Sequence, residues 1–432
     1  MQYYSTKNKA LRDPLRVALM QGLAPDGGLY MPLGIPILER KQLEALHGKS
    51  LPEIAVFLAA LLFGEDIPED ELRSLTSDAI YFDTPLKEVG KNLYSLELFH
   101  GPTLAFKDVG ARFLARLMGY FARENEHETH ILVATSGDTG SAVANGFLGV
   151  AGVQVHILYP SGLVSPLQEK QFTTLGQNTS AIEIEGTFDD CQRLVKTAFM
   201  DRKLKEKIRL SSANSINLAR FLPQAFYYFR AWAQLETPSD FFFAVPSGNY
   251  GNMTAGLVAR EMGLPVHTFL SANNRNDVVP AYLKSGNYRP RPSVATIANA
   301  MDVGNPSNFD RILDLFDNRH DRISQHIKGY AYSDEQIREI IGRVYQQSGY
   351  LCDPHGATAC QAARTFQEAH PGQTGIFLET AHPAKFTESV EAVIAEKIQI
   401  PERLARFAQL EKKTTRLSGE YEAFRAYLTA LL

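Results

Sequence analysis

The fold of this chain follows from residues 131–140, ILVATSGDTG. The four apolar residues predict a buried strand, and a loop of small, glycine-rich and hydroxyl-bearing residues follows them at once. A helical pattern then begins at Ser141. Residues 240–252, DFFFAVPSGNYGN, repeat this order of strand, glycine loop and helix. Such units are typical of α/β proteins with parallel sheets, which bind ligands at the carboxyl ends of their strands.

Apolar runs alternate with helical patterns on both sides of these two loops, which favours βαβ units. Strands are predicted at 92–96, 131–134, 154–159, 181–185, 240–245, 266–270 and 375–378, and helices at 109–123 and from 141 onward. Residues 22–32 are rich in glycine and proline, and mostly helical patterns follow them up to about residue 80; the tail after Pro401 also has a helical pattern. We therefore predict a mainly helical amino-terminal subdomain (1–85), a smaller α/β domain (86–235) and a larger α/β domain (236–432).

The composition is that of an ordinary globular protein. Hydrophobic residues make up 44% and charged residues 21% of the 432, and the formal net charge is −4. This charge gives no general attraction for nucleic acid or membranes, so any anion must be held by local groups. The longest apolar run, residues 54–63, is too short to span a membrane and predicts a buried helix. The start of the chain lacks the pattern of a secretory signal.

The cysteines favour a reducing compartment. Cys191, Cys352 and Cys360 are odd in number and widely spaced. They form no C-x-x-C pair, so a disulfide framework is disfavoured and we expect a cytoplasmic protein.

Lys107 lies in an apolar setting, FHGPTLAFKD at residues 99–108. Burial disfavours the charged ammonium, so its pKa should fall toward the ~7–8 that suits covalent and proton-transfer chemistry. The alternative is a lysine whose stem covers apolar surface while its amine stays in water. The neighbouring Asp108 receives no role from the sequence.

Two glycine loops are candidates for anion binding. Residues 247–252 precede a predicted helix, whose free N–H groups and positive dipole end favour a phosphate. Residues 136–140 have a similar form, and their amides and hydroxyls would suit a substrate carboxylate. An ordinary βα turn also favours Gly and Asn, so each loop alone leaves both interpretations open.

Two further segments carry polar groups of interest. In residues 214–220, Asn214 or Ser215 could cap a helix, and Arg220 could bind a phosphate through its planar fork. A capped helix with an exposed arginine is the alternative. Thr380 follows the predicted strand 375–378, where a hydroxyl could bond a heteroaromatic nitrogen, or could simply stabilise a turn.

Other familiar motifs do not fit. Residues 48–50, GKS, lack the upstream glycine and strand of a nucleotide-triphosphate loop. Residues 127–130, HETH, have the wrong spacing for a zinc helix, and we predict no metal site. The absence of a G-x-G-x-x-G motif disfavours a nicotinamide dinucleotide.

Taken together, an apolar lysine, two anion loops and a late hydroxyl favour pyridoxal phosphate. The chain resembles the threonine synthase family, in its longer bacterial and fungal form, at residues 99–108, 134–142, 246–252 and 380–386. The likeness also includes residues 22–32 and 165–168, so it covers almost the whole chain. It implies the tryptophan synthase β-type fold (pyridoxal phosphate fold type II), with two open, mostly parallel sheets flanked by helices.

The resemblance also implies roles for residues. Lys107 would be the catalytic and Schiff-base lysine, and Thr380 would bond the pyridine nitrogen. The remaining cofactor-binding residues would be Gly248, Asn249, Tyr250, Gly251 and Asn252. The substrate-binding residues would be Thr135, Ser136, Gly137, Asp138, Thr139, Asn214, Ser215 and Arg220.

The reaction that the resemblance implies is a lyase reaction of threonine biosynthesis. O-phospho-L-homoserine and water would give L-threonine and phosphate by γ-elimination and β-hydration. A serine/threonine dehydratase-like enzyme and a non-catalytic cofactor-binding homologue are the alternatives. We expect a small-molecule substrate, no nucleic-acid or membrane partner, and a monomer or homodimer.

Overall fold

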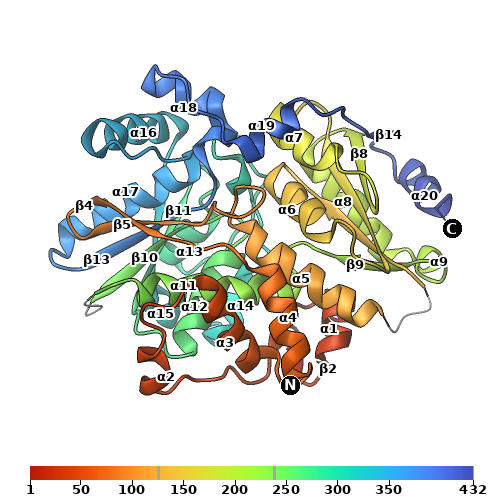
Figure 1. The fold of residues 1–432 in the computed structure, drawn as a ribbon, viewed down its shortest axis with the longest axis horizontal. Helices are drawn as coiled ribbons and strands as arrows, with labels where there is room; N and C mark the ends of the chain where they lie inside the picture. Colours follow the sequence, from red (N-terminus) through yellow and green to blue (C-terminus); the bar gives the residue numbers. More distant parts are fainter. Residues whose placement is uncertain (124–126, 237–239, 432) are drawn as a thin grey trace.

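In the computed structural model, which describes residues 1–123, 127–236 and 240–431, two open sheets lie side by side with helices around them (Figure 1). The larger sheet has the strand order β12-β11-β10-β13-β5-β4. All its neighbouring strands are parallel except the edge pair β4 and β5. Its strands are β4 (Leu86–Gly90), β5 (Leu93–Glu97), β10 (Phe241–Pro246), β11 (Thr268–Asn273), β12 (Ile327–Ala331) and β13 (Thr374–Glu379).

The smaller sheet is parallel throughout, with the order β14-β8-β7-β6-β9. Its strands are β6 (Thr129–Ala134), β7 (Val153–Pro160), β8 (Thr179–Glu185), β9 (Arg209–Ser212) and β14 (Thr415–Ser418). Each of the seven predicted strands is present within a few residues of its expected bounds. The predicted α/β class with mostly parallel sheets is therefore confirmed.

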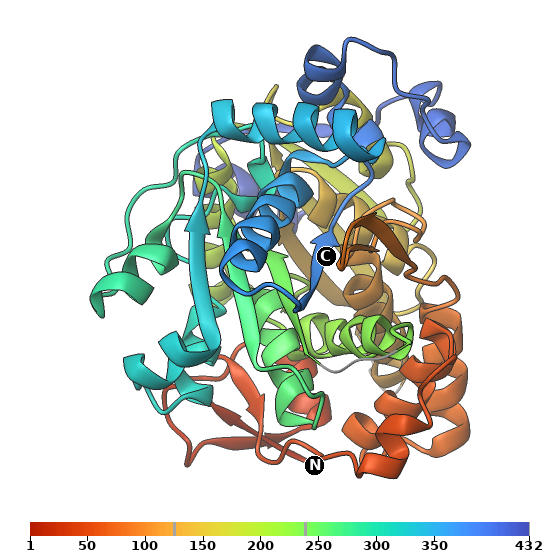
Figure 2. The ribbon, with the colours of Figure 1, turned by 90° about the vertical axis from the view of Figure 1, so that its left-hand side faces the viewer.

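The amino-terminal part contains a small antiparallel sheet that the sequence analysis did not predict. Its order is β2-β1-β3, formed by β1 (Gln2–Ser5), β2 (Arg12–Pro14) and β3 (Tyr30–Pro32). Four helices accompany it: α1 (Leu15–Gln21), α2 (Arg40–Glu44), α3 (Leu51–Phe63) and α4 (Glu69–Ala79). These elements lie together along one side of the molecule in both Figure 1 and Figure 2.

Both faces of the smaller sheet are buried. Side chains along a strand alternate between the two faces, and helices cover each face. Ile131 and Val133 of β6 belong to the core shared with α5 (Lys107–Ala122) and α6 (Asp138–Phe147). Leu132 and Ala134 belong to a second core with α8 (Phe188–Met200) and α20 (Tyr421–Thr429). Burial on both faces explains why residues 131–134 are all apolar.

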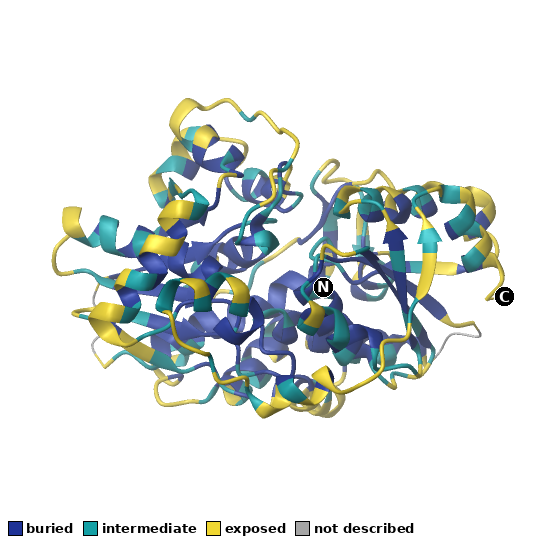
Figure 3. Ribbon diagram, turned by 90° about the horizontal axis from the view of Figure 1, so that it is seen from above, coloured by how far each residue is buried: buried dark blue, intermediate teal, exposed yellow. Residues whose placement is uncertain are grey.

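The larger sheet follows the same rule. Phe241, Phe243 and Val245 of β10 face the core of α3, α11 (Ala225–Ala233) and α12 (Gly251–Glu261). Phe242 and Ala244 face α16 (Asp334–Ser348) and α17 (Pro354–Ala369). Figure 3 shows buried residues gathered around both sheets and exposed ones on the outer helices and loops.

Shorter helices complete the chain. They are α7 (Pro166–Thr173), α9 (Arg202–Lys205), α10 (Leu218–Phe221), α13 (Val278–Ser285), α14 (Phe309–Leu315), α15 (His320–His326), α18 (Thr387–Ile394) and α19 (Glu402–Ala408), with 3-10 turns η1 (Leu222–Gln224), η2 (Asn299–Met301) and η3 (Pro383–Phe386). None of the helices in the described ranges is long and apolar enough to cross a membrane.

The sheets do not follow the predicted boundaries along the chain. β4 and β5 precede the smaller sheet in sequence, yet β5 pairs with β13 of the larger sheet. β14 lies in the tail, for which the sequence predicted only helices, and it pairs with β8 of the smaller sheet. The division at residues 85 and 235 stays a prediction about folding units, while each sheet draws on strands from both sides of residue 235.

Close packing of α5 against α10 places Lys107 and Arg220 near each other. A Cβ built at Gly110 would lie 2.2 Å from the carbonyl oxygen of Arg220, which is backbone and cannot move aside. Only glycine therefore allows this helix contact.

We expect Gly110→Ala to lower the free energy of unfolding by about 1–3 kcal/mol, because the methyl group forces the two helices apart. Denaturant unfolding measures this loss. Gly119→Ala on the same helix is the matched control, since its Cβ would meet only Cγ1 of Val150. Equal stability losses in both variants would contradict the claim that the α5–α10 contact is the constraint.

Candidate active site

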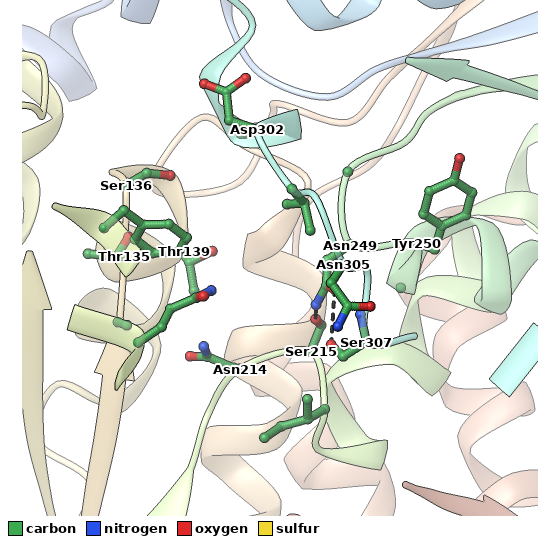
Figure 4. Close-up of a pocket in the computed structure, with 18 of the residues that line it drawn as sticks. Thr135, Ser136, Thr139, Asn214, Ser215, Asn249, Tyr250, Asp302, Asn305 and Ser307 are labelled. Atoms are coloured by element: carbon green, nitrogen blue, oxygen red, sulfur yellow. Dashed lines mark hydrogen bonds between the residues drawn. The ribbon is translucent and has the colours of Figure 1, made fainter. Parts of the chain in front are cut away.

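A cavity of about 750 Å³ lies where loops from both sheets converge. Its wall includes residues that follow β6, β10 and β13, and also Leu23, Gly27 and Leu29 of the amino-terminal loop. Figure 4 shows Thr135, Ser136 and Thr139 on one side of it and Ser215, Asn249 and Ser307 on the other. The carboxyl ends of parallel strands thus form the site, as the strand-loop pattern predicts.

Lys107, the first residue of α5, lies on the cavity wall. Its Nζ is 5.0 Å from the centre of the Phe106 ring. Burial lowers the pKa of its amine, and the charges of Lys385 and Arg220 lower it further against the opposing pull of Asp138. The predicted shift in pKa therefore has the expected direction and cause.

Asp108, which had no predicted role, closes the loop that leads to Lys107. Its carboxylate accepts hydrogen bonds from the Thr103 backbone N–H at 2.8 Å and from the Thr103 hydroxyl at 2.6 Å. The intervening Leu104 has a positive φ of 59°. The buried carboxylate thus fixes a tight turn and with it the start of α5.

The loop after β10 presents backbone to the cavity. A Cβ at Gly248 would lie 2.7 Å from the carbonyl oxygen of Ala300, so only glycine fits. Tyr250 caps the amino end of α12 with a left-handed φ of 62°, and its hydroxyl bonds Ser271 at 2.6 Å. Its ring therefore points away from the cavity centre (Figure 4). What Tyr250 can offer a ligand is its backbone N–H at a helix amino terminus.

Asn252, which lines the cavity, has one donor group without a described partner. Its Oδ1 accepts hydrogen bonds from the hydroxyls of Tyr227 at 2.8 Å and Tyr228 at 2.7 Å. This fixes the amide, and its Nδ2 has no partner among the described residues. A buried amide without a partner is costly unless a ligand accepts its hydrogen bond.

Arg220 is a buried cation on the same wall, 3% exposed. Its Nη1 donates to the carbonyl oxygen of Lys107 at 3.2 Å, while Nε meets no acceptor in the described part of the chain. Burial lowers its pKa to about 10, so it stays charged at neutral pH. Asp108 attracts this charge from a distance, but Arg220 forms no ion pair with a described residue, and such a guanidinium at a cavity favours an anion there.

The cap of the helix that carries Arg220 differs from the prediction. Asn217, not Asn214 or Ser215, caps α10 by accepting a hydrogen bond from the N–H of Ala219. Asn214 and Ser215 are thereby left on the cavity wall, and Oδ1 of Asn214 has no described partner. The predicted helix is not continuous: it is divided into α10, η1 and α11, because Pro223 interrupts the regular bonding.

The loop after β6 is only partly on the cavity wall. Thr135, Ser136 and Thr139 line it, but Gly137 and Asp138 lie behind them. Asp138 accepts a hydrogen bond from Gln168 at 2.8 Å and pairs with Nζ of Lys385 at 2.6 Å. Burial by itself would raise the pKa of Asp138, but the Lys385 and Lys107 charges hold it well below its usual range.

Thr380 follows β13 on the cavity wall, and its carbonyl oxygen accepts the Phe106 N–H at 2.8 Å. Behind it, Glu379 accepts the Asp353 N–H, and burial raises the pKa of Glu379 far above its usual value. Asp353 in turn binds Nδ1 of His355 at 2.5 Å, while Nε2 of His355 accepts the Ala300 N–H at 3.2 Å. His355 is therefore held in one tautomer at the cavity.

Several site residues had no signal in the sequence analysis. Lys385 lies inside the motif 380–386, but only the folded chain brings it to Asp138. Asp353 and Pro354 are a regular helix start, which could have located His355. Asp302 also lines the cavity, and burial raises its pKa to about 6. Asn308 and Arg311 lie in a stretch without recognisable periodicity.

These residues fit pyridoxal phosphate. The site has a lysine with a lowered pKa, a glycine loop too crowded for a side chain, a helix amino terminus, and two buried donor groups, on Asn252 and Arg220, that lack described partners. The helix amino terminus and the amide of Asn252 place hydrogen-bond donors at the loop after β10, and such donors suit a phosphate.

Three family models match the chain. A model described as "Pyridoxal-phosphate dependent enzyme" matches residues 78–378. Models for "Threonine synthase N terminus" and "Threonine synthase, C-terminal" match residues 2–80 and 356–428. Together they account for nearly the whole chain.

Individual proteins are similar over their full length. A threonine synthase of Haemophilus influenzae is 44% identical over 430 residues, which covers 99% of each chain. The crystal structure of threonine synthase from Escherichia coli superposes with a TM-score of 0.93 at 40% identity and covers all of both chains. That of the threonine synthase from Brucella melitensis with bound pyridoxal phosphate superposes with a TM-score of 0.94 at 36% identity, covering 100% and 99%. The expected type of fold is confirmed.

We expect Lys385→Met to lower the free energy of unfolding at pH 7 by about 3–5 kcal/mol, because it leaves the buried Asp138 carboxylate without its partner. The folded-state pKa of Asp138 lies below its unfolded value. The stabilisation that the ionised Asp138 gives to the folded state is therefore present above about pH 4 and is lost as the pH falls further. Urea unfolding at pH 7 and below pH 4 should show a shallower acid dependence in the variant than in the wild type.

The double variant Asp138→Asn/Lys385→Met is the control. It removes both charges, so it should be more stable than Lys385→Met alone. A loss below about 1 kcal/mol in the single variant, the range of an exposed ion pair, would show that this pair does not hold the two loops together.

Proposed function

The chain belongs to the threonine synthase family of pyridoxal-phosphate-dependent enzymes, and we propose that it converts O-phospho-L-homoserine and water into L-threonine and phosphate, the last step of threonine biosynthesis. The observation that carries this proposal is the combination in one cavity of a pKa-lowered lysine and two separate groups of donors. One group lies at the amino end of α12, and the other is centred on Arg220. A phosphorylated cofactor and a phosphorylated substrate require two such sites.

The cofactor would be held by Lys107, by residues 248–252 and by Thr380. The backbone N–H groups at the start of α12 and the amide of Asn252 would bind its phosphate. The Thr380 hydroxyl would bond its ring nitrogen, and unlike a carboxylate it does not enforce a proton there. When bound, pyridoxal phosphate supplies an electron sink that stabilises negative charge on the carbon beside the substrate amine.

The substrate would be oriented by two groups of side chains. Arg220, with Asn214 and Ser215, would bind its phosphate, and the guanidinium fork suits that group. Thr135, Ser136 and Thr139 lie across the cavity from Ser215 (Figure 4) and would bind the carboxylate of the substrate. Gly137 and Asp138, also predicted to bind substrate, would act through this loop, since they lie behind its cavity surface.

Lys107 would move the protons. Its lowered pKa leaves a larger neutral fraction of the amine at neutral pH, and a neutral amine can accept the proton from the substrate α-carbon. The departing phosphate, held by Arg220, has a second pKa of ~6 and could exchange a proton with the water that adds at the β-carbon. Both steps use groups that converge on the same cavity.

A serine/threonine dehydratase-like reaction is the alternative within enzymes. It needs no second phosphate site, so the buried Arg220 with an unpartnered Nε argues against it. A non-catalytic cofactor-binding homologue is the other alternative, and it gives no reason for the lowered pKa of Lys107. The cytoplasmic location and the monomeric or homodimeric state stay predictions.

We expect Lys107→Ala to lose the visible absorbance of lysine-bound cofactor and to form threonine at least about 100-fold more slowly, because both the covalent anchor and the proton acceptor are removed. Absorbance spectra and a threonine assay measure the two effects. Lys196→Ala is a matched control, because Lys196 also borders the cavity but is exposed on α8. Retention of the absorbance band in Lys107→Ala would exclude Lys107 as the anchor.

We expect Arg220→Ala to raise the KM for O-phospho-L-homoserine about 10- to 100-fold, the effect of a lost charge-assisted hydrogen bond. O-acetyl-L-homoserine, which lacks the phosphate, is the comparison ligand. Its inhibition constant should change much less, while Arg220→Lys should restore part of the lost affinity. If both ligands are weakened equally, Arg220 does not bind the substrate phosphate.

A further inference from the structure

Two hydrogen-bond chains meet at the hydroxyl of Ser215. Nδ2 of Asn249 donates to its Oγ at 2.7 Å, and Nδ2 of Asn308 donates to the same oxygen at 3.0 Å. Asn249 belongs to the loop after β10, whereas Asn308 lies at the start of α14. The hydroxyl therefore receives one donor from each of two distant segments.

Arg311 determines which way the Asn308 amide faces. Nη1 of Arg311 donates to Oδ1 of Asn308 at 2.5 Å, and a guanidinium can only donate. The oxygen of the amide must therefore face Arg311, which turns the NH₂ group toward Ser215.

Arg311 itself has no freedom to turn. It is fully buried, and its other N–H groups donate to the carbonyl oxygens of Tyr30, Ser215 and Ile216 at 2.7–3.2 Å. Its guanidinium carbon lies 4.1 Å from the centre of the Phe221 ring. This one side chain thus ties the amino-terminal sheet, segment 214–217 and α14 together.

The Asn249 amide is fixed in the same way. The backbone N–H of Ser307 donates to its Oδ1 at 2.7 Å, and the Ser307 hydroxyl does so at 3.0 Å (Figure 4). Because a backbone N–H can only donate, the amide nitrogen must face Ser215.

A serine hydroxyl has two lone pairs and one hydrogen. Both lone pairs of Ser215 are taken by the two amides, so the hydrogen is what remains for a ligand. Ser215 lines the cavity, and its Cβ lies 3.3 Å from the position of a Cβ built at Gly251, in the first turn of α12. The hydrogen is thus available beside a helix amino terminus, where anions are favoured.

We propose that Arg311, Asn308 and Asn249 are positioning residues that restrict the Ser215 hydroxyl to donating, and that it donates to an oxygen of a bound phosphate. Ser215 lies between the two proposed phosphate sites, beside the start of α12 and in the segment that leads to Arg220, so this phosphate is that of the substrate or that of the cofactor. The proposal rests on the proposed function, since it concerns a phosphate of the cofactor or of the substrate. A hydroxyl restricted in this way discriminates between ligands. It favours a group that only accepts hydrogen bonds over one that must donate.

The positive charge of Arg311 also favours a phosphate as the ligand. Its contacts are with neutral carbonyl and amide oxygens, and it forms no ion pair with a described residue. Burial lowers its pKa to about 9, so it remains a cation at neutral pH. The neighbouring Asp310 attracts this charge but forms no ion pair with it, so the buried cation behind segment 214–217 still favours an anion in front of it.

Asn308→Asp tests the proposal with almost no change in volume. One carboxylate oxygen can keep the bond to Arg311, but the other cannot donate to Ser215. The serine hydrogen then turns toward the introduced carboxylate and away from the ligand. Asn249→Asp is the parallel change on the second chain, and it keeps the bond from the Ser307 N–H.

Two measurements distinguish the cofactor phosphate from the substrate phosphate. The dissociation constant of pyridoxal phosphate relative to that of pyridoxal reports the cofactor phosphate, and the KM for O-phospho-L-homoserine reports the substrate phosphate. We expect at least about a tenfold increase in one of them for either variant, the size of one lost hydrogen bond to a charged group. Thermal unfolding verifies that each variant is folded.

Ser215→Ala and the double variant Ser215→Ala/Asn308→Asp separate the hydroxyl from the added charge. If Asn308→Asp acts through the hydroxyl, the double variant binds no more weakly than Ser215→Ala. If the losses of affinity in Ser215→Ala and Asn308→Asp multiply in the double variant, the two changes act independently and the proposal is wrong. It is also wrong if the variants fold and neither readout changes. A wild-type protein that makes no threonine would instead refute the proposed function, because the cofactor readout does not depend on turnover.

Discussion

Buried positive charge beside one cavity is the constraint on which the rest of the structure depends. Arg220 and Arg311 are almost fully buried, and they meet carbonyl oxygens instead of carboxylates. Burying a cation without an acidic partner is costly, so the surrounding backbone must offer its oxygens in fixed positions. The segments that supply them carry Tyr30, Lys107 and Ser215, and these define the cavity wall from three parts of the chain. Phosphate ligands would complete this arrangement by supplying the missing negative charge.

The two sheets position these segments because neither is formed by one continuous part of the chain. Strand β5 crosses into the larger sheet before the smaller one begins, and β14 returns to the smaller sheet at the end. The ion pair between Asp138 and Lys385 then joins a loop of the smaller sheet to the segment that follows β13. Lys107 lies between these loops, so its electrostatic environment is set by both sheets at once.

Much of the fold and part of the site could be predicted from local patterns. Each of the seven predicted strands contains closely spaced apolar residues, and each ligand loop is a cluster of glycine, hydroxyl or amide residues at the end of such a strand. A short stretch of sequence was therefore sufficient to predict them. Prediction from a short stretch of sequence failed where a partner that is distant in the sequence decides the local structure. Strand β14 exists because β8 offers it an edge, and Asn217 replaces Asn214 as a cap because its side chain also bonds Leu19 of the amino-terminal part.

The sequence by itself determined the α/β class, the positions of seven strands of the two large sheets, and the identity of the lysine and the loops. These depend on the order of apolar, small and polar residues along the chain, which is a local property. The tertiary structure alone decided which polar groups face the cavity and which lie behind it. Asp138 and the side chains of Asn249 and Tyr250 turned out to have protein partners, whereas Asn252 and Arg220 kept free donor groups. A polar side chain that bonds to a protein partner is not available to a ligand. That partner can lie hundreds of residues away along the chain, as Lys385 does from Asp138, so local sequence patterns do not identify it.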